Sequence, residues 1–338
     1  MHEALLWEPD GDRVHCLLCP NDCRIADGAR GTCGVRENRG GVLQALTYGL
    51  VSSVAVDPIE KKPVFHFRPG TRALSIGSVG CSMRCGHCQN WQISRARPGE
   101  ETRLDRLPAG EVVALADEHG CEGVAFTYNE PVIWIEYVLD VARACKEAGL
   151  YTVMVTNGYI TSAGLDLIGE HIDVWRVDVK GFSDGVYREL CKVRSVAPVL
   201  EAAERAQTRW GMHVEVVTNV IPTLNDDDET LTGIAHWIRD TLGPDTPWHI
   251  TRFFPYLELD HLSPTPVATL ERARRIGLES GLHFVFLGNV SVPGGEDTVC
   301  PKCGEVAIAR TGYTITARAV RDGACSRCGT PLGVKGSG

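Results

Sequence analysis

The stretch Cys81-Ser82-Met83-Arg84-Cys85-Gly86-His87-Cys88 places three cysteines in one short loop. The loop follows the apolar run 73–77, which predicts a buried strand. Cysteine thiolates are the usual ligands of iron–sulfur clusters, and a four-iron cluster normally takes four of them. Three thiolates therefore predict a [4Fe-4S] cluster in which one iron has no protein ligand. An open metal position of this kind admits a substrate or a cofactor.

The whole chain has 338 residues, enough for a large core and for more than one structural unit. Its formal net charge is −9, so no basic footprint points to nucleic acid. No apolar run reaches the length of a membrane span, and the N-terminus lacks the basic region and apolar core of a signal peptide. We therefore expect a cytoplasmic protein whose 14 cysteines are mainly metal ligands rather than disulfide partners.

Residues 1–45 carry a second group of cysteines and are expected to form an N-terminal metal module. The segment is rich in turn residues and too small to fold around a core of its own. A metal held by four thiolates would supply the missing stability. The spacing suits zinc or another structural metal and also an auxiliary iron–sulfur cluster, and free thiols are a third interpretation. The four residues are Cys16, Cys19, Cys23 and Cys33.

Residues 294–335 carry a third group, arranged as two CxxC pairs around a predicted hairpin over 307–310 and 313–316. This arrangement is typical of a zinc ribbon or a rubredoxin-like knuckle that binds zinc or iron. Four thiolates close such a site, so we expect a structural role. The pairs are Cys300 with Cys303 and Cys325 with Cys328. Three further cysteines stand alone and are expected to be small buried hydrophobic residues, namely Cys121, Cys145 and Cys191.

From residue 73 onward, short β-branched runs alternate with longer amphipathic segments. The segment 131–148 is one such helix, opened by Pro131 and closed by Gly149. Strand–helix alternation predicts a parallel sheet, and six or seven units favour an α/β fold with a partial (β/α)6-type barrel over residues 73–293. The predicted strands are 73–77, 123–127, 151–156, 173–178, 213–219, 248–252 and 283–287.

A connecting arm over residues 46–72 is expected to join the N-terminal module to the barrel. Its clustered charges and three prolines, Pro58, Pro63 and Pro69, argue against a core element. Two interpretations stay open for the arm, either contact with the cysteine loop or a solvated linker.

Polar side chains follow successive predicted strands, at the end of a barrel where active sites lie. Capping preferences explain any one of them, because Asn, Asp and Gly are common in such turns. Their repetition around the barrel predicts a functional site. The residues concerned are Thr127 to Glu130, Thr156 to Gly158, Asp178, Lys180, Thr218 and Asn219, with His249 and Arg252 on the sixth strand.

Taken in order, these motifs resemble those of the radical S-adenosylmethionine (SAM) enzyme of the AmmeMemoRadiSam system, a group related to the activating enzymes of pyruvate formate-lyase. The resemblance covers nearly the whole chain. It rests on the N-terminal and C-terminal cysteine groups, Asp57-Pro58-Ile59-Glu60-Lys61-Lys62-Pro63, the loop 81–88 with Gln89-Asn90-Trp91, Phe126-Thr127-Tyr128-Asn129-Glu130-Pro131 and Val155-Thr156-Asn157-Gly158.

The resemblance implies roles for the matched residues. Cys81, Cys85 and Cys88 would hold the [4Fe-4S] cluster, and the amino and carboxylate groups of SAM would chelate its open iron. Tyr128-Asn129-Glu130 stands where related enzymes have a Gly-Gly-Glu-Pro motif that contacts the SAM amino group. Other SAM-binding candidates are Asn157, Asp178 and Lys180, near the ribose or carboxylate, and more weakly His249 and Arg252.

The resemblance also implies an activity. A reduced cluster would cleave SAM to methionine and a 5′-deoxyadenosyl radical, which would abstract hydrogen from an unknown substrate. That substrate would be a protein, as in glycyl-radical activases, or a small molecule, lipid or tRNA. The implied partners are an electron donor such as flavodoxin or ferredoxin, together with Memo-type and AMME-type proteins. A non-catalytic metal-binding or electron-transfer protein is the alternative from another class.

Overall fold

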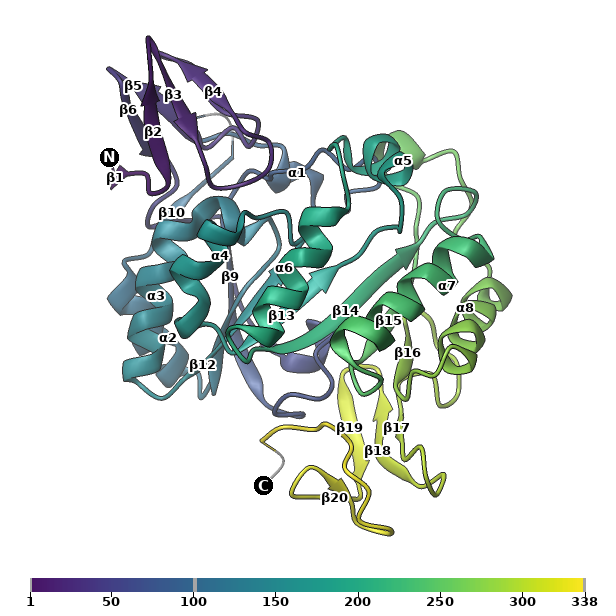
Figure 1. Cartoon of the computed structure of the whole chain (residues 1–338). Helices are drawn as coiled ribbons and strands as arrows, with labels where there is room; N and C mark the ends of the chain where they lie inside the picture. Colours follow the sequence, from purple (N-terminus) through teal and green to yellow (C-terminus); the bar gives the residue numbers. More distant parts are fainter. Residues whose placement is uncertain (1, 100–101, 337–338) are drawn as a thin grey trace.

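An eight-stranded sheet forms the centre of the computed structural model (Figure 1). The structure describes residues 2–99 and 102–336; Met1 of the predicted N-terminal module and residues 100–101 of the predicted barrel lie outside the described residues. The strand order is β16-β15-β14-β13-β12-β11-β9-β8. The strands are β8 Ser53–Pro58, β9 Arg72–Gly77, β11 Gly123–Phe126, β12 Tyr151–Thr156, β13 Val174–Asp178, β14 His213–Val220, β15 Trp248–Arg252 and β16 Val285–Gly288.

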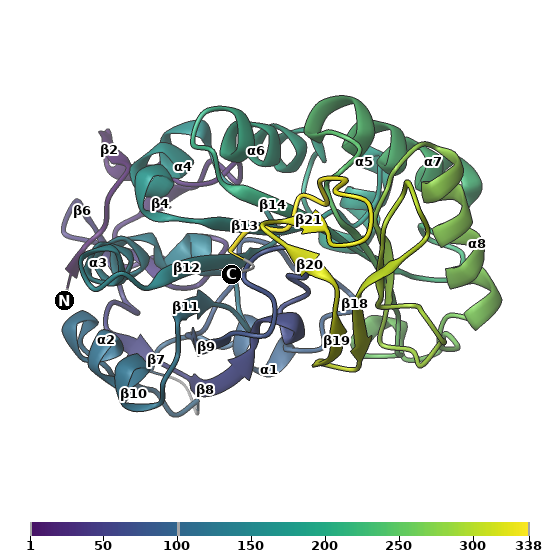
Figure 2. The same cartoon turned by 90° about the horizontal axis from the view of Figure 1, so that it is seen from below.

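All neighbouring strands from β9 to β16 pair in parallel, which confirms the predicted partial barrel. Helices lie in an arc outside the strands (Figure 2). The α-helices of the described residues are α1 Trp91–Ser94, α2 Ala109–Glu118, α3 Ile135–Glu147, α4 Ser162–Ile168, α5 Asp184–Val186, α6 Ala197–Thr208, α7 Asp228–Trp237 and α8 Val267–Glu279. Among the described residues, no helix is both long and apolar enough to cross a membrane.

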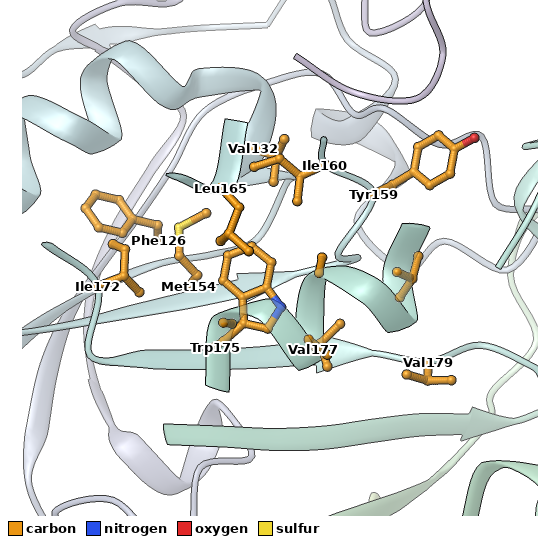
Figure 3. Packing of buried hydrophobic residues seen from close by; sticks show 14 of the residues in the cluster. Phe126, Val132, Met154, Tyr159, Ile160, Leu165, Ile172, Trp175, Val177 and Val179 are labelled. Atoms are coloured by element: carbon orange, nitrogen blue, oxygen red, sulfur yellow. The ribbon is translucent and has the colours of Figure 1, made fainter. Parts of the chain in front are cut away.

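Successive side chains on each strand point to opposite faces of the sheet and form two apolar layers. On β9, Leu74 and Ile76 belong to the large core beneath the helices, whereas Ala73 belongs to a smaller cluster inside the barrel. Figure 3 shows part of the large core, where Phe126, Met154 and Trp175 pack with Leu165 of α4. Trp175 is fully buried, and removing so large a side chain typically costs about 3–5 kcal/mol.

The predicted connecting arm requires a correction, because part of it belongs to the sheet. Strand β8 pairs antiparallel with β9, from Ser53 opposite Gly77 to Pro58 opposite Arg72. The prolines do not exclude a strand here, because β8 is an edge strand and Pro58 is its last residue. Beyond β8, Ile59 and Val64 fill the inside of the barrel. The segment therefore closes one end of the barrel instead of crossing solvent.

Two small modules flank the barrel at opposite ends (Figure 1). The N-terminal module contains the sheets β2-β3-β4 and β1-β6-β5, and the C-terminal module contains β17-β18-β19 and β20-β21. Strands β7 and β10 form a separate pair. The bounds are β1 His2–Glu3, β2 Trp7–Asp10, β3 Arg13–Cys16, β4 Arg24–Ala26, β5 Arg36–Arg39, β6 Val42–Ala45, β7 Leu50–Val51, β10 Asp105–Arg106, β17 Thr298–Val299, β18 Val306–Thr311, β19 Thr314–Arg318, β20 Val320–Arg321 and β21 Ala324–Cys325.

Candidate active site

A pocket of about 770 Å³ opens inside the barrel, and the cysteine loop forms part of its wall. Further lining comes from the carboxyl ends of the strands, from residues 60–65 and from Tyr313 in the turn between β18 and β19. Seven of the eight residues named above as SAM-binding candidates line this pocket, and Arg252 is the exception. The seven are Tyr128, Asn129, Glu130, Asn157, Asp178, Lys180 and His249.

Close backbone packing positions the cysteine loop. Gly77 ends β9, and a Cβ there would lie 2.5 Å from the carbonyl oxygen of Thr127. Gly80 has a φ of +88°, and a Cβ there would lie 2.8 Å from the carbonyl oxygen of Cys33. Glycine is therefore needed at both positions, by close approach at Gly77 and by backbone conformation as well at Gly80. The loop is held between the barrel and the N-terminal module.

The three thiols of the loop face the pocket in a setting that suits an iron–sulfur cluster. Burial raises the pKa of Cys81 and of Cys88, which disfavours their thiolates as long as no metal is bound. Donors point at the sulfurs: the Met83 N–H lies 3.4 Å and the Asn157 amide 3.5 Å from Cys81 Sγ. Hydrogen bonds to sulfur stabilise thiolates that ligate a metal and tune its potential. The donor set therefore fits a [4Fe-4S] cluster with an open iron.

Asn129 and Tyr128 fix the backbone around the loop. The Asn129 side chain accepts from the Ser78 N–H at 2.8 Å and donates to the carbonyls of Val79 and Gly80, each at 3.2 Å. Tyr128 has a φ of +75°, a conformation that favours glycine. This conformation explains why glycine suits the equivalent position of the Gly-Gly-Glu-Pro motif. In this chain the side-chain amide of Asn129 is hydrogen-bonded to backbone groups of the protein, so Asn129 is a positioning residue.

Glu130 is buried and already satisfied within the protein. Its carboxylate accepts from the Val132 N–H at 3.0 Å, from the Thr156 hydroxyl at 2.6 Å and from the Asn157 N–H at 2.8 Å. The bond to Val132 caps the 3-10 turn Pro131–Trp134 that leads into α3. Burial raises the pKa of Glu130 to about 7. A cation such as an ammonium group would favour its charged form.

Asn157, Asp178 and Lys180 lie near the loop on neighbouring strand ends. Asn157 donates to Cys81 Sγ and, at 3.1 Å, to the Ser82 hydroxyl. Asp178 forms ion pairs with Lys180, at 2.9 Å, and with Arg176. These two cations hold the pKa of Asp178 below its usual value despite its burial. The group therefore offers fixed charges of both signs to a zwitterionic ligand.

His249 and Arg252 are separated from this group. His249 lines the pocket, but its Nε2 lies 2.6 Å from Glu215, whose carboxylate also accepts from the backbone N–H groups of Phe65 and His66. It thus belongs to a network that anchors the segment closing the barrel. Arg252 donates to the carbonyl of Thr265 at 2.9 Å and does not line the pocket within the described part of the chain.

Several residues in the pocket or directly behind it were missed by sequence reasoning. Lys62 is buried against Asp57 at 2.6 Å and lies 4.7 Å from the centre of the Tyr128 ring. Arg176 lines the pocket two residues before Asp178, so strand alternation could have identified it. Cys191 lies behind the loop, and a hydrogen bond with it lowers the pKa of Cys85. No spacing rule could have revealed that contact.

The C-terminal cysteines come together as predicted. The sulfurs of Cys300, Cys303, Cys325 and Cys328 all lie within 4.8 Å of one another. Cys300 and Cys325 are buried, and both pack in a cluster with Phe65 and Phe286 of the barrel. This group could hold a metal ion that links the module to the barrel base.

Comparisons with known proteins agree with this geometry. Residues 75–234 match the radical SAM superfamily. An uncharacterized protein of Methanocaldococcus jannaschii, MJ0808, is 41% identical over 339 residues, which cover 99% of both chains. The pyruvate formate-lyase 1-activating enzyme of Escherichia coli K12 is 26% identical over 232 residues, or 64% of this chain and 93% of that protein. A radical SAM methyltransferase from Sphaerobacter thermophilus superposes with a TM-score of 0.51 at 17% identity, over 65% of this chain and 66% of that one.

The barrel and its three-cysteine loop thus define an iron–sulfur enzyme that uses SAM. The chain belongs to the radical SAM superfamily and is distantly related to pyruvate formate-lyase-activating enzymes.

Proposed function

We propose that this chain holds a [4Fe-4S] cluster on Cys81, Cys85 and Cys88, binds SAM beside it and acts on a second substrate. One observation carries the proposal. These three thiols line the pocket, and no other cysteine of the described residues does. When bound, the cluster and SAM supply a one-electron cleavage to methionine and a 5′-deoxyadenosyl radical that takes hydrogen from the substrate.

The residues of the chain position these groups. Asn157 would orient Cys81 through its amide, and Asn129 would hold the backbone that leads into the loop. Asp178 and Lys180 would face the charged groups of SAM. The barrel walls and the segment 59–65 would exclude water from the radical.

Within the superfamily, we propose that the chain is the radical SAM enzyme of the AmmeMemoRadiSam system and that its substrate is a protein. The order of the motifs supports the first part. The relation to pyruvate formate-lyase-activating enzymes supports the second. A flavodoxin or ferredoxin would donate the electron, and Memo-type and AMME-type proteins are the proposed partners.

The activity is tested with anaerobically reconstituted, dithionite-reduced protein. It should release 5′-deoxyadenosine from SAM, and the triple variant with Cys81, Cys85 and Cys88 changed to alanine should not. Cys121→Ala is the matched control, because Cys121 lies outside the pocket lining. SAM cleavage by the triple variant would refute the assignment.

The substrate is tested by adding candidate Memo-type and AMME-type proteins together with SAM deuterated at the 5′ carbon. A protein substrate should raise 5′-deoxyadenosine formation and leave a protein radical detectable by electron paramagnetic resonance (EPR). Stimulation by a metabolite extract, lipid or tRNA instead of the proteins would overturn the protein-substrate proposal.

A further inference from the structure

The four N-terminal cysteines enclose a space of their own. Cys16 ends β3, and Cys19, Cys23 and Cys33 follow in the connecting turns. Their side chains line a small cavity whose other walls include Ile25, Ile133 and Arg36. Cys16 and Cys33 are buried, so the space is largely closed to solvent. This cavity is separate from the pocket in the barrel.

The spacing of the sulfurs distinguishes this site from the C-terminal one. Four sulfurs about 2.3 Å from a single zinc ion lie about 3.8 Å apart and leave no space between them. The C-terminal site has this geometry, with Cys300 and Cys328 3.6 Å apart and Cys303 and Cys325 3.7 Å apart.

The N-terminal sulfurs stand further apart. Among the described residues, no three of these four sulfurs lie within 4.8 Å of one another. Around a single ion all four would lie closer together than this. The wider spacing fits a cubane core, which carries its four thiolates on four separate iron atoms.

Several N–H groups around the cavity donate hydrogen bonds to the cysteine sulfurs. The N–H of Thr32 lies 3.5 Å from Cys23 Sγ, and the Asn21 amide lies 3.6 Å from Cys19 Sγ. Arg36 is buried, pairs with Glu136 and donates from Nη1 to Cys16 Sγ at 3.7 Å. Its Nε is buried without a hydrogen-bond partner. A bridging sulfide would offer an acceptor for this N–H.

The cavity lies directly beside the loop that carries the three pocket cysteines. The amide of Asn21 donates to the carbonyl of Ser82 at 2.7 Å as well as to Cys19. Arg84 donates to the carbonyl of Thr32 at 3.1 Å, and Gly80 packs on the carbonyl of Cys33. One layer of backbone and side chain therefore separates the two sets of thiols.

We propose that Cys16, Cys19, Cys23 and Cys33 hold a second [4Fe-4S] cluster, close enough to the first for their electron spins to interact. The occupancy of the N-terminal site stands on its own geometry. The spin interaction rests in addition on the proposed function, because it requires the cluster at Cys81, Cys85 and Cys88.

Iron and acid-labile sulfide are measured on the full chain after anaerobic reconstitution. The variant lacking Cys81, Cys85 and Cys88 isolates the N-terminal site and keeps all four of its cysteines. It should retain about four iron and four sulfide per chain and give the EPR signal of a reduced four-iron cluster. The double variant Cys19→Ala, Cys33→Ala should lose that complement and keep the SAM-binding cluster. The variant Cys121→Ala should keep both.

The same samples report the distance between the sites. Fully reduced wild-type protein should show a broadened, split EPR spectrum that differs from the sum of the spectra of the two variants. A simple sum would overturn the proposed proximity. One zinc and no sulfide retained at the N-terminal cysteines of the triple variant would overturn the cluster itself. Neither result bears on SAM cleavage, which tests the proposed function separately.

Discussion

The carboxylate of Glu130 accepts the backbone N–H of Asn157 at 2.8 Å, which ties the end of β11 to the end of β12. The same Asn157 points its side-chain amide at Cys81 Sγ. A buried acid, the end of a strand and the Cys81 thiol are thus joined in one chain of contacts. Changes at Glu130 should therefore be felt both in stability and at the pocket.

The first prediction concerns the pH dependence that Glu130 gives to stability. Burial raises its pKa in the folded protein to about 7, above the ordinary value of 4.5. The stability from this raised pKa is fully present below the unfolded-state pKa and is lost as pH rises through the folded-state pKa. Gln cannot ionise. The free energy of unfolding of the Glu130→Gln variant should therefore rise by about 2 kcal/mol relative to that of the wild type between pH ~5 and pH ~8. Calorimetric unfolding across this range measures the difference, and parallel pH profiles would contradict the prediction.

A second prediction concerns SAM affinity. Glu130 lines the pocket, and a charge-assisted bond to the SAM ammonium would contribute roughly 1.5–3 kcal/mol. The Glu130→Gln variant should therefore bind SAM about tenfold more weakly, as measured by the spectroscopic shift of the reconstituted cluster. Glu60→Gln is the matched control, since Glu60 is another buried carboxyl on the pocket wall. Unchanged affinity in Glu130→Gln would leave Glu130 as a capping residue only.

A third prediction concerns the hold of Asn129 on the cysteine loop. The Asn129→Ala variant leaves the Ser78 N–H and the carbonyls of Val79 and Gly80 without their partner. Each unsatisfied buried group costs about 1–3 kcal/mol. We expect lower thermal stability and a loss of iron from the loop during gel filtration.

The control for this prediction is Asn219→Ala. Asn219 also lines the pocket, but its amide donates to Thr251. Iron content should stay normal in this variant. Full iron retention in Asn129→Ala would show that the loop is ordered by other contacts.

A fourth prediction concerns the C-terminal module. Its four sulfurs have the spacing of a single-ion site, and a structural metal supplies much of a small module's folding energy. Cys300→Ala or Cys328→Ala should lower the melting temperature and the zinc content, while the spectrum of the SAM-binding cluster stays unchanged. Elemental analysis and calorimetry check both points. Loss of labile sulfide in these variants would instead indicate an iron–sulfur cluster at this end.

The sequence by itself determined the parts of this protein that depend on local pattern. The seven strands predicted from apolar runs all occur, because a run such as 151–156 fits only a buried parallel strand in this setting. The grouping of eleven cysteines into three sets could likewise be predicted, because metal ligands are often closely spaced along the chain. The polar strand ends pointed to one edge because parallel strands end on the same side.

Only the tertiary structure decided the features that depend on contacts between residues far apart in the sequence. Strand β8 is recognisable only by its pairing with β9, because Pro58 and the prolines that follow the strand resemble those of a linker. The side chains of Asn129 and Glu130 accept hydrogen bonds from the backbone N–H groups of Ser78 and Asn157. These partners are distant in the sequence, so only the folded barrel brings them together. The sequence left the N-terminal four-cysteine site open between a single metal ion and a cluster, and only the structure shows that its sulfurs lie further apart than those of the C-terminal site. Sulfur-to-sulfur distance is set by the packing around a site, and spacing along the chain does not encode it.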